Sequence, residues 1–319
     1  MILVTGGNGF IGSAILRRLK EDGRHGIRAA MRKTSPASIQ SVDIAAVGDI
    51  GLDTDWSLAL RGVSILVHCA ARVHVMSETA ACPLDEFRRV NVQGTLNLAR
   101  QAVGAGVRRF IFVSSIKVNG ETTRLGHPFT AEDRPSPSDT YGVSKMEAER
   151  SLRDLLISSG MELVIIRPPL VYGPGVKANF DRLVRAVDRG LPLPLGAIDN
   201  RRSLVSLENL VDLVVTAVEH PDAANQTFLV SDGEDMSTTQ LIKKIGHALG
   251  KPPKLIPVPL ILLKLAGGLI GRREAIQRLC GSLQVDIEKT RQVLGWNPPL
   301  SVDEGLQRVA EEYARETPV

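Results

Sequence analysis

The stretch that decides the fold is ILVTGGNGFIG, residues 2–12. Its apolar start predicts a short buried strand, and glycines then recur at every third position, at 6, 9 and 12. Glycine tolerates positive φ and lets the backbone approach a bound anion closely. A helical pattern begins directly afterwards, so the first N–H groups of that helix point toward the same anion. The stretch therefore predicts a strand–turn–helix unit that binds a dinucleotide diphosphate. The residues expected to line it are Gly6, Gly9, Phe10, Ile11 and Gly12.

Strands and helices are predicted to alternate through the first half of the chain. Short apolar segments typical of buried strands are separated by segments in which apolar residues recur with helical spacing. The strand segments are residues 2–4, 27–31, 63–68, 109–113 and 162–166, and the helical segments are residues 11–20, 87–103 and 140–159. Such alternation predicts βαβ units around a parallel sheet.

Two lobes are predicted within this α/β fold. We expect a Rossmann-type doubly wound parallel sheet that binds NAD(P) over residues 1–167, and a smaller C-terminal substrate-binding lobe over residues 168–319. The sequence changes character after Arg167, because residues 168–196 contain five prolines and four glycines, a density typical of loops. Residues 203–230 are expected to return to the first sheet. The cleft between the lobes is the predicted site.

The composition excludes several classes of protein. The chain has 319 residues, 43% of them hydrophobic and 23% charged, with a net charge of +4, which is unlike a disordered chain. The most apolar stretch, residues 255–271, is broken by Pro257, Pro259 and Lys264, so a buried or surface-packed helix is expected and no membrane span. Three scattered cysteines predict no disulfide framework and no metal site, and favour a cytoplasmic protein. Basic residues are dispersed without interleaved aromatics, so no nucleic acid is expected.

The residues after the second strand bear on the choice of cofactor. An acidic residue usually stands there to bond the ribose 2′-hydroxyl of NAD. This chain has Arg32 and Lys33 instead, a basic pair that suits a 2′-phosphate. We therefore expect NADP, with NAD as the alternative. Asp49 and Ile50 form a candidate turn on the adenine side.

The candidate catalytic residues are Ser115, Tyr141 and Lys145. Tyr141 and Lys145 are four residues apart in a helical segment, which places both on one face of the helix. A protonated Lys beside a Tyr favours the phenolate and so prepares it for proton transfer. Ser115 follows a strand, and strand carboxyl ends face the ligand crevice in a doubly wound sheet. We expect Ser115 and Tyr141 to contact the same substrate oxygen.

These motifs together resemble the extended short-chain dehydrogenase/reductases, in the NAD-dependent epimerase/dehydratase family that acts on nucleotide sugars. The resemblance spans essentially the whole chain. The matching elements are the glycine-rich loop, His68-Cys69-Ala70-Ala71, Asn91-Val92-x-Gly94-Thr95, Ser114-Ser115, Tyr141-x-x-x-Lys145, residues 167–175 (RPPLVYGPG) and Leu294-Gly295-Trp296-x-Pro298.

The resemblance implies roles for further residues. Ala70, Ala71 and Arg72 would line the cofactor, Asn91 would organise the ribose side, and Pro168 and Val171 would contact the nicotinamide. A UDP moiety would be held by Asn179, by Arg202 on its pyrophosphate and by the loop containing Leu195, while His74 and Lys117 would face the sugar. The resemblance also implies a homodimer, formed through the helices near residues 87–103 and 140–159.

Three reactions share this machinery. A 4,6-dehydratase carries an acidic pair directly after the Ser, where this chain has Ile116 and Lys117, so we set it aside. Arg32 and Lys33 favour an NADP-dependent 4-reductase, most closely one that reduces a UDP-4-keto-6-deoxy-HexNAc in surface-polysaccharide biosynthesis. A UDP-glucose or UDP-GlcNAc 4-epimerase with bound NAD is the alternative. Many UDP-sugar enzymes of this family have Asn where Leu170 stands, so an NADP-dependent reductase of a non-sugar ketone is a further alternative.

Overall fold

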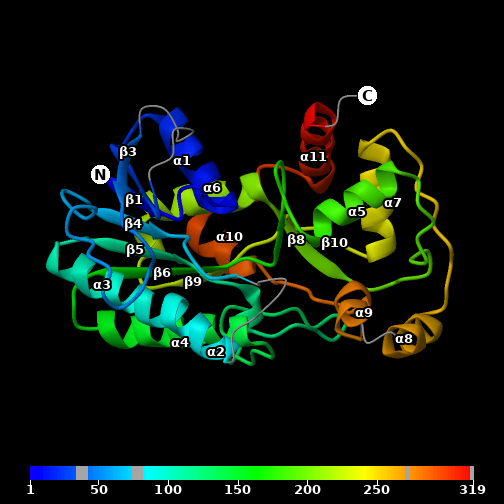
Figure 1. Cartoon of the computed structure of the whole chain (residues 1–319), viewed down its shortest axis with the longest axis horizontal. Helices are drawn as coiled ribbons and strands as arrows, with labels where there is room; N and C mark the ends of the chain where they lie inside the picture. Colours follow the sequence, from blue (N-terminus) through cyan, green and yellow to red (C-terminus); the bar gives the residue numbers. More distant parts are fainter. Residues whose placement is uncertain (34–41, 74–81, 270–272, 317–319) are drawn as a thin grey trace.

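A seven-stranded parallel sheet forms the larger part of the molecule (Figure 1). The computed structural model describes residues 1–33, 42–73, 82–269 and 273–316. The strand order is β3-β2-β1-β4-β5-β6-β9, and every neighbouring pair is parallel. This order confirms the predicted doubly wound fold. The strands are β1 (Ile2–Thr5), β2 (Ile27–Met31), β3 (Asp43–Ala46), β4 (Ile65–His68), β5 (Arg109–Val113), β6 (Glu162–Arg167) and β9 (Thr227–Leu229).

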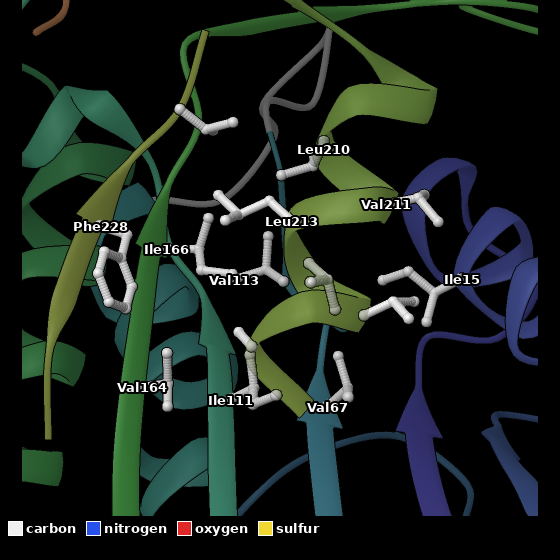
Figure 2. Close-up of a cluster of buried hydrophobic side chains, with 14 of the residues drawn as sticks. Ile15, Val67, Ile111, Val113, Val164, Ile166, Leu210, Val211, Leu213 and Phe228 are labelled. Carbon is white, nitrogen blue, oxygen red and sulfur yellow. The ribbon is translucent and has the colours of Figure 1, made fainter. Parts of the chain in front are cut away.

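Helices cover both faces of this sheet because neighbouring residues of each strand point to opposite faces. Ile111 of β5 packs with Ile15 and Leu213 on one face, as Figure 2 shows. Phe110, its neighbour in the chain, packs on the other face with Leu98. The covering helices are α1 (Phe10–Asp22), α6 (Leu207–Glu219) and α10 (Glu288–Leu294) on the first face, and α3 (Thr95–Gly104) and α4 (Thr140–Leu156) on the second, where α2 (Pro83–Arg88) packs against α4.

A second, three-stranded sheet organises the other lobe. Its order is β10-β8-β7, with β8 parallel to β7 and antiparallel to β10. A third apolar cluster, which includes Tyr172, Leu204 and Ile242, fills this lobe. Its elements are β7 (Leu170–Tyr172), β8 (Arg202–Ser206), β10 (Asp235–Met236), α5 (Asn179–Asp188), α7 (Thr238–Ala248), α8 (Leu260–Leu269), α9 (Arg273–Cys280) and α11 (Val302–Glu316).

The chain passes between the two lobes more than once. After β8 in the small sheet, α6 returns to the face of the large sheet, and β9 pairs with β6 at its edge. The chain then goes back to β10 and α7 in the second lobe.

The helical segment predicted over residues 87–103 is interrupted in the structure. It comprises the end of α2, a π-helical turn, η1 (Arg89–Gly94), and α3. The π turn carries Asn91 toward the loop after β4, where its side chain bonds the backbone of Arg72. Apolar spacing does not reveal this turn, because buried apolar residues occur on both sides of it, Phe87 before it and Leu98 after it.

Within the described part of the chain, no helix has the length and apolar character needed to cross a bilayer. The same residues contain no group of His, Cys, Asp and Glu that could hold a metal ion.

Candidate active site

The residues predicted to bind the cofactor follow adjacent strands of the large sheet. Strands β3, β2, β1, β4, β5 and β6 are neighbours and run in one direction, so their carboxyl ends form a single edge. The structure therefore brings together, on this edge, the segments that carry Asp49 and Ile50 after β3, Arg32 and Lys33 after β2, the glycine loop after β1, Ala70 to Arg72 after β4, Ser115 after β5 and Pro168 after β6.

The glycine loop is packed so closely that side chains would not fit. Gly6 has a φ of +69°, and a Cβ there would lie 3.0 Å from the Ala70 nitrogen. A Cβ on Gly12 would overlap the Gly6 carbonyl oxygen, and Gly9 N–H donates to that same oxygen at 2.8 Å. Gly9 is the N-cap of α1 and offers no side chain to cap it. This loop and the first turn of α1, with Phe10 and Ile11, thus have the shape and dipole that a diphosphate requires.

His68, the last residue of β4, positions the glycine loop through hydrogen bonds, a role that sequence reasoning missed. Its Nδ1 lies 2.7 Å from Thr5 Oγ1 and its Nε2 lies 2.9 Å from Thr95 Oγ1. Thr5 Oγ1 in turn accepts from the Ala70 N–H at 3.2 Å. Burial, assisted by the charge of Lys145, lowers the pKa of His68 to about 3, so the ring is neutral.

Asn91 joins the loop after β4 to the catalytic helix. Its Oδ1 accepts from the Arg72 N–H at 2.8 Å, and its Nδ2 donates to the Arg72 carbonyl and to Ser144 Oγ, both at 3.0 Å. Ser144 Oγ donates to the Tyr141 carbonyl at 2.8 Å. The Asn91 side chain is therefore occupied by protein groups, and it fixes the backbone of Arg72.

Ser115 and Tyr141 lie on two segments that are packed against each other. Ser115 is the N-cap of a short 3₁₀ helix, η2 (Ile116–Val118), and its Oγ accepts from the Lys117 N–H at 3.2 Å. The N-terminus of α4 rests on η2 so closely that a Cβ on Gly142 would lie 2.8 Å from the Lys117 carbonyl oxygen. Asp139 caps α4 by accepting from the Gly142 N–H at 2.6 Å.

Lys145 is buried one helical turn beyond Tyr141. Its Nζ donates to the Val113 carbonyl at 2.9 Å and lies 4.3 Å from the centre of the Phe112 ring. Burial lowers the pKa of Lys145 to about 8, while Cys69 and Glu149 oppose this shift. The charge is thus held at the end of β5, directly before the two serines.

One electrostatic expectation requires correction. The sequence predicts that Lys145 lowers the pKa of Tyr141, whereas burial, followed by the charge of Asp139, raises it. The physical reason is that neighbouring groups remove water from the half-buried ring, with Phe87 packed edge-on at 6.2 Å between ring centres. In the protein alone, the phenol is therefore kept protonated.

The adenine side carries an ion pair. Arg32 Nε lies 2.7 Å from Asp49 Oδ1, and both side chains are exposed. Lys33, next to Arg32, is exposed as well. Ile50 packs against η1, where a Cβ on Gly94 would lie 2.5 Å from Ile50 Cγ2.

The residues assigned to the nicotinamide and sugar lie around the junction of the lobes. Pro168 is buried and its carbonyl accepts from the Ile116 N–H at 2.9 Å, whereas Val171 is half-buried. Lys117 pairs with Glu121 and Asp139. Leu170, at 47% exposure, presents an apolar side chain to the surface.

The residues predicted to contact the nucleotide differ in their exposure and in their hydrogen-bond partners. Asn179 is exposed at the start of α5. The Arg202 guanidinium donates to the carbonyls of Arg278 at 2.6 Å and Gly281 at 3.1 Å. Leu195 is only 7% exposed and packs in the third apolar cluster. His74 lies outside the described residues.

Sequence reasoning also missed a buried ion pair behind the catalytic residues. Arg167 donates to both carboxylate oxygens of Glu149, at 2.9 and 2.6 Å. Glu149 also accepts from Ser114 Oγ at 2.6 Å, and Arg167 donates to Asn119 Oδ1 at 2.9 Å. The signal was available, because Glu149 follows Lys145 by four residues and so lies on the same face of α4.

Comparison with known proteins agrees with this geometry. Residues 2–231 match the model of the NAD dependent epimerase/dehydratase family. The chain is 50% identical over 315 residues to UDP-glucose 4-epimerase from Vibrio cholerae, which covers 98% of this chain and 95% of that protein. Two solved structures have a TM-score of 0.78 and cover 99% of both chains. They are MoeE5 in complex with UDP-glucose and NAD, at 25% identity, and UDP-glucose 4-epimerase from Thermotoga maritima with UDP-glucose, at 24%.

Both the glycine loop and the candidate catalytic residues fall inside the matched range, and the fold is that of the NAD(P)-dependent short-chain dehydrogenase/reductases. The chain therefore belongs to the NAD-dependent epimerase/dehydratase family of extended short-chain dehydrogenase/reductase enzymes.

Proposed function

We propose that this enzyme is a UDP-hexose 4-epimerase that retains NAD throughout its catalytic cycle. The 50% identity to a UDP-glucose 4-epimerase over nearly the whole chain carries this proposal. It reverses the preference drawn from Arg32 and Lys33, which favour an NADP-dependent 4-reductase. The epimerase was the alternative reading of the same catalytic residues.

The chain's own residues account for the binding of the cofactor. The glycine loop and the N-terminus of α1 would hold the diphosphate, and the segment Ala70–Arg72 would line the opposite side of it. When bound, the oxidised nicotinamide supplies a hydride acceptor and a positive charge. Lys145, fixed on the Val113 carbonyl, adds a second positive charge at the end of β5.

Proton transfer falls to Tyr141 and Ser115. As the C4–H bond of the sugar breaks, the Tyr141 oxygen takes the proton of the C4 hydroxyl, and it returns that proton when the opposite C4 epimer forms. Ser115 Oγ already accepts from the Lys117 N–H, so its own O–H is directed elsewhere and donates to the sugar oxygen. Burial makes the Tyr141 phenolate costly, so positive charge near the ring decides when it deprotonates.

The substrate diphosphate is assigned to the second lobe. Arg202 is anchored on two carbonyls at the end of α9, which leaves its remaining N–H groups to a phosphate. Asn179 stands exposed at the start of α5 for the nucleotide. While the diphosphate is held in this way, the keto sugar can rotate in the site without dissociating.

NAD, rather than NADP, suits this proposal for two reasons. Epimerisation consumes no reductant, so the cofactor need not exchange. Arg32 is also already paired with Asp49 at 2.7 Å, which reduces the charge that it offers to a 2′-phosphate.

Identification of the nucleotide that purifies with the protein tests the proposal. The enzyme is denatured, the released nucleotide is identified, and native enzyme is incubated with UDP-glucose without added cofactor. We expect bound NAD and conversion to the C4 epimer. An empty protein that oxidises added NADPH only with a UDP-4-keto sugar would establish the reductase, and reduction of a non-sugar ketone alone would exclude both. Light scattering on the same sample tests the homodimer, which stays a prediction.

A further inference from the structure

Helix α8 presents its apolar side to solvent. Its sequence is LILLKLAGGL, and only Leu263 and Gly267 are buried. Four large apolar side chains of this helix are more than half exposed. These are Ile261 at 72%, Leu262 at 54%, Leu265 at 60% and Leu269 at 89%.

These four side chains share one face. At about 100° per residue, positions 261, 262, 265 and 269 fall within an arc of about 100°, opposite Leu263 and Gly267. A surface helix of a globular protein normally places polar residues there. A group of large exposed apolar residues on one face marks an interaction surface, unlike single scattered ones. We call this set the α8 face.

The segment of the chain that contains α8 is positively charged. Residues 251–269 contain three lysines and no Asp or Glu. Lys264 flanks the apolar arc, and Lys254 precedes the helix; both are exposed. In the part of the chain that is described, neither of them pairs with a carboxylate, whereas Lys251 pairs with Asp188 at 2.5 Å.

The apolar face and the positive charge together indicate which kind of partner binds. A second copy of this chain would bring the lysines of two α8 faces together, and like charges repel. A bilayer that contains anionic lipid accepts the apolar side chains at its interface and attracts the lysines. Ten residues are too few to cross a bilayer, so such a helix lies in the plane of the membrane surface.

The α8 face lies on the substrate side of the molecule. Helix α9 follows α8 and packs against it, and the carbonyls at the end of α9 hold Arg202 (Figure 1). Contact through α8 would therefore bring the segment that anchors Arg202 close to the lipid surface.

We propose that the α8 face, together with Lys254 and Lys264, binds the surface of an anionic lipid bilayer, so that the enzyme works as a peripheral membrane protein. Cosedimentation of the full chain with vesicles tests this. We expect binding to vesicles of phosphatidylcholine with phosphatidylglycerol, weaker binding in high salt, and little binding to phosphatidylcholine alone.

Variants of exposed residues test which side chains bind the vesicles, and one of these variants is the control. Leu265→Gln with Leu269→Gln should weaken vesicle binding by about tenfold or more, because two apolar anchors are lost. Lys264→Glu should weaken binding to the anionic vesicles and leave binding to phosphatidylcholine vesicles unchanged. Leu58→Gln, at a residue that is 65% exposed and lies outside the α8 face, should bind as the wild type does. All variants should keep the wild-type melting temperature and turnover in solution.

Three results would overturn the proposal. The wild type and the double variant could bind vesicles equally, or binding could ignore the lipid charge. The double variant could instead change the mass measured by light scattering, which would make the α8 face a contact between copies. None of these measurements depends on turnover, so their failure is distinct from failure of the epimerase assay.

Discussion

The part of the enzyme that carries Ser115, Tyr141 and Lys145 (the catalytic half) differs from the lobe assigned to the substrate (the substrate half) in how deeply its functional side chains are buried. Behind the catalytic residues, Ser114, Glu149 and Arg167 are each at most 3% exposed and are joined by hydrogen bonds in one network. Around the proposed sugar site, Leu170 is 47% exposed and Asn179 is exposed. The reaction centre is thus fixed by buried partners, whereas Leu170 and Asn179, at the proposed substrate site, are surface side chains that substitution can change at little cost to the fold.

The largest effect is expected at the reaction centre itself. Tyr141→Phe removes the group that transfers the proton and should lower kcat by about 10²–10⁴-fold. Its backbone partners remain, so the melting temperature and the bound nucleotide should stay as in the wild type. A variant that retains near-wild-type turnover would show that another group transfers the proton.

Removing one partner of the buried ion pair should affect stability most. Glu149→Gln leaves the Arg167 charge buried without a carboxylate, and we expect the free energy of unfolding to fall by about 3–5 kcal/mol. Denaturation in urea measures this. As the matched control, Asp181→Asn breaks the exposed pair with Arg185 at 2.9 Å and should cost at most about 1 kcal/mol. Equal losses in the two variants would contradict the contrast between the halves.

His68 should make the stability of the catalytic half depend on pH. Its pKa is about 3 in the folded protein and 6.5 for an exposed imidazole, so the unfolded chain binds the proton first as the pH falls. Stability from this group is full above 6.5 and is lost toward 3, at up to about 1.4 kcal/mol per pH unit. Comparison with His68→Gln at each pH isolates the effect, and parallel curves for the two proteins would refute it.

The smallest effect is expected in the substrate half. Leu170→Asn restores the polar residue found in many UDP-sugar enzymes of this family and adds one hydrogen bond to the substrate. Such a bond should lower KM for a UDP-hexose by about two- to tenfold without a change in kcat. Leu170→Ala removes the same bulk without adding a polar group and should not lower KM. If both variants behave alike, Leu170 does not contact the substrate.

The sequence predicts the catalytic half better than the substrate half for a physical reason. Glycine spacing in the loop, strand ends at Ser115 and helical spacing at Tyr141 and Lys145 are local patterns, and the parallel sheet converts them into one edge. Helical spacing places Glu149 on the same face of α4 as Lys145, but its partner Arg167 is 18 residues away on β6, so only packing reveals their contact.

Two further features depend on burial, which a local pattern does not contain. The pKa of Tyr141 rises because neighbouring groups remove water from the half-buried ring, although the charge of Lys145 predicts the opposite. The stretch at residues 255–271 contains the predicted helix over Leu260–Leu269, but only Leu263 and Gly267 of it are buried, whereas the sequence predicts a buried or surface-packed helix. Which of its apolar residues face the solvent emerges only from the structure.

The return of the chain to the large sheet has a consequence for folding. A fragment that ends at Arg167 would lack β9, and its last strand, β6, would become an unprotected edge. It would also lack α6, so apolar residues such as Ile111 and Ile166 would lose their cover (Figure 2). We expect such a fragment to aggregate when it is expressed alone, because the dinucleotide-binding half becomes soluble only after synthesis has passed Leu229.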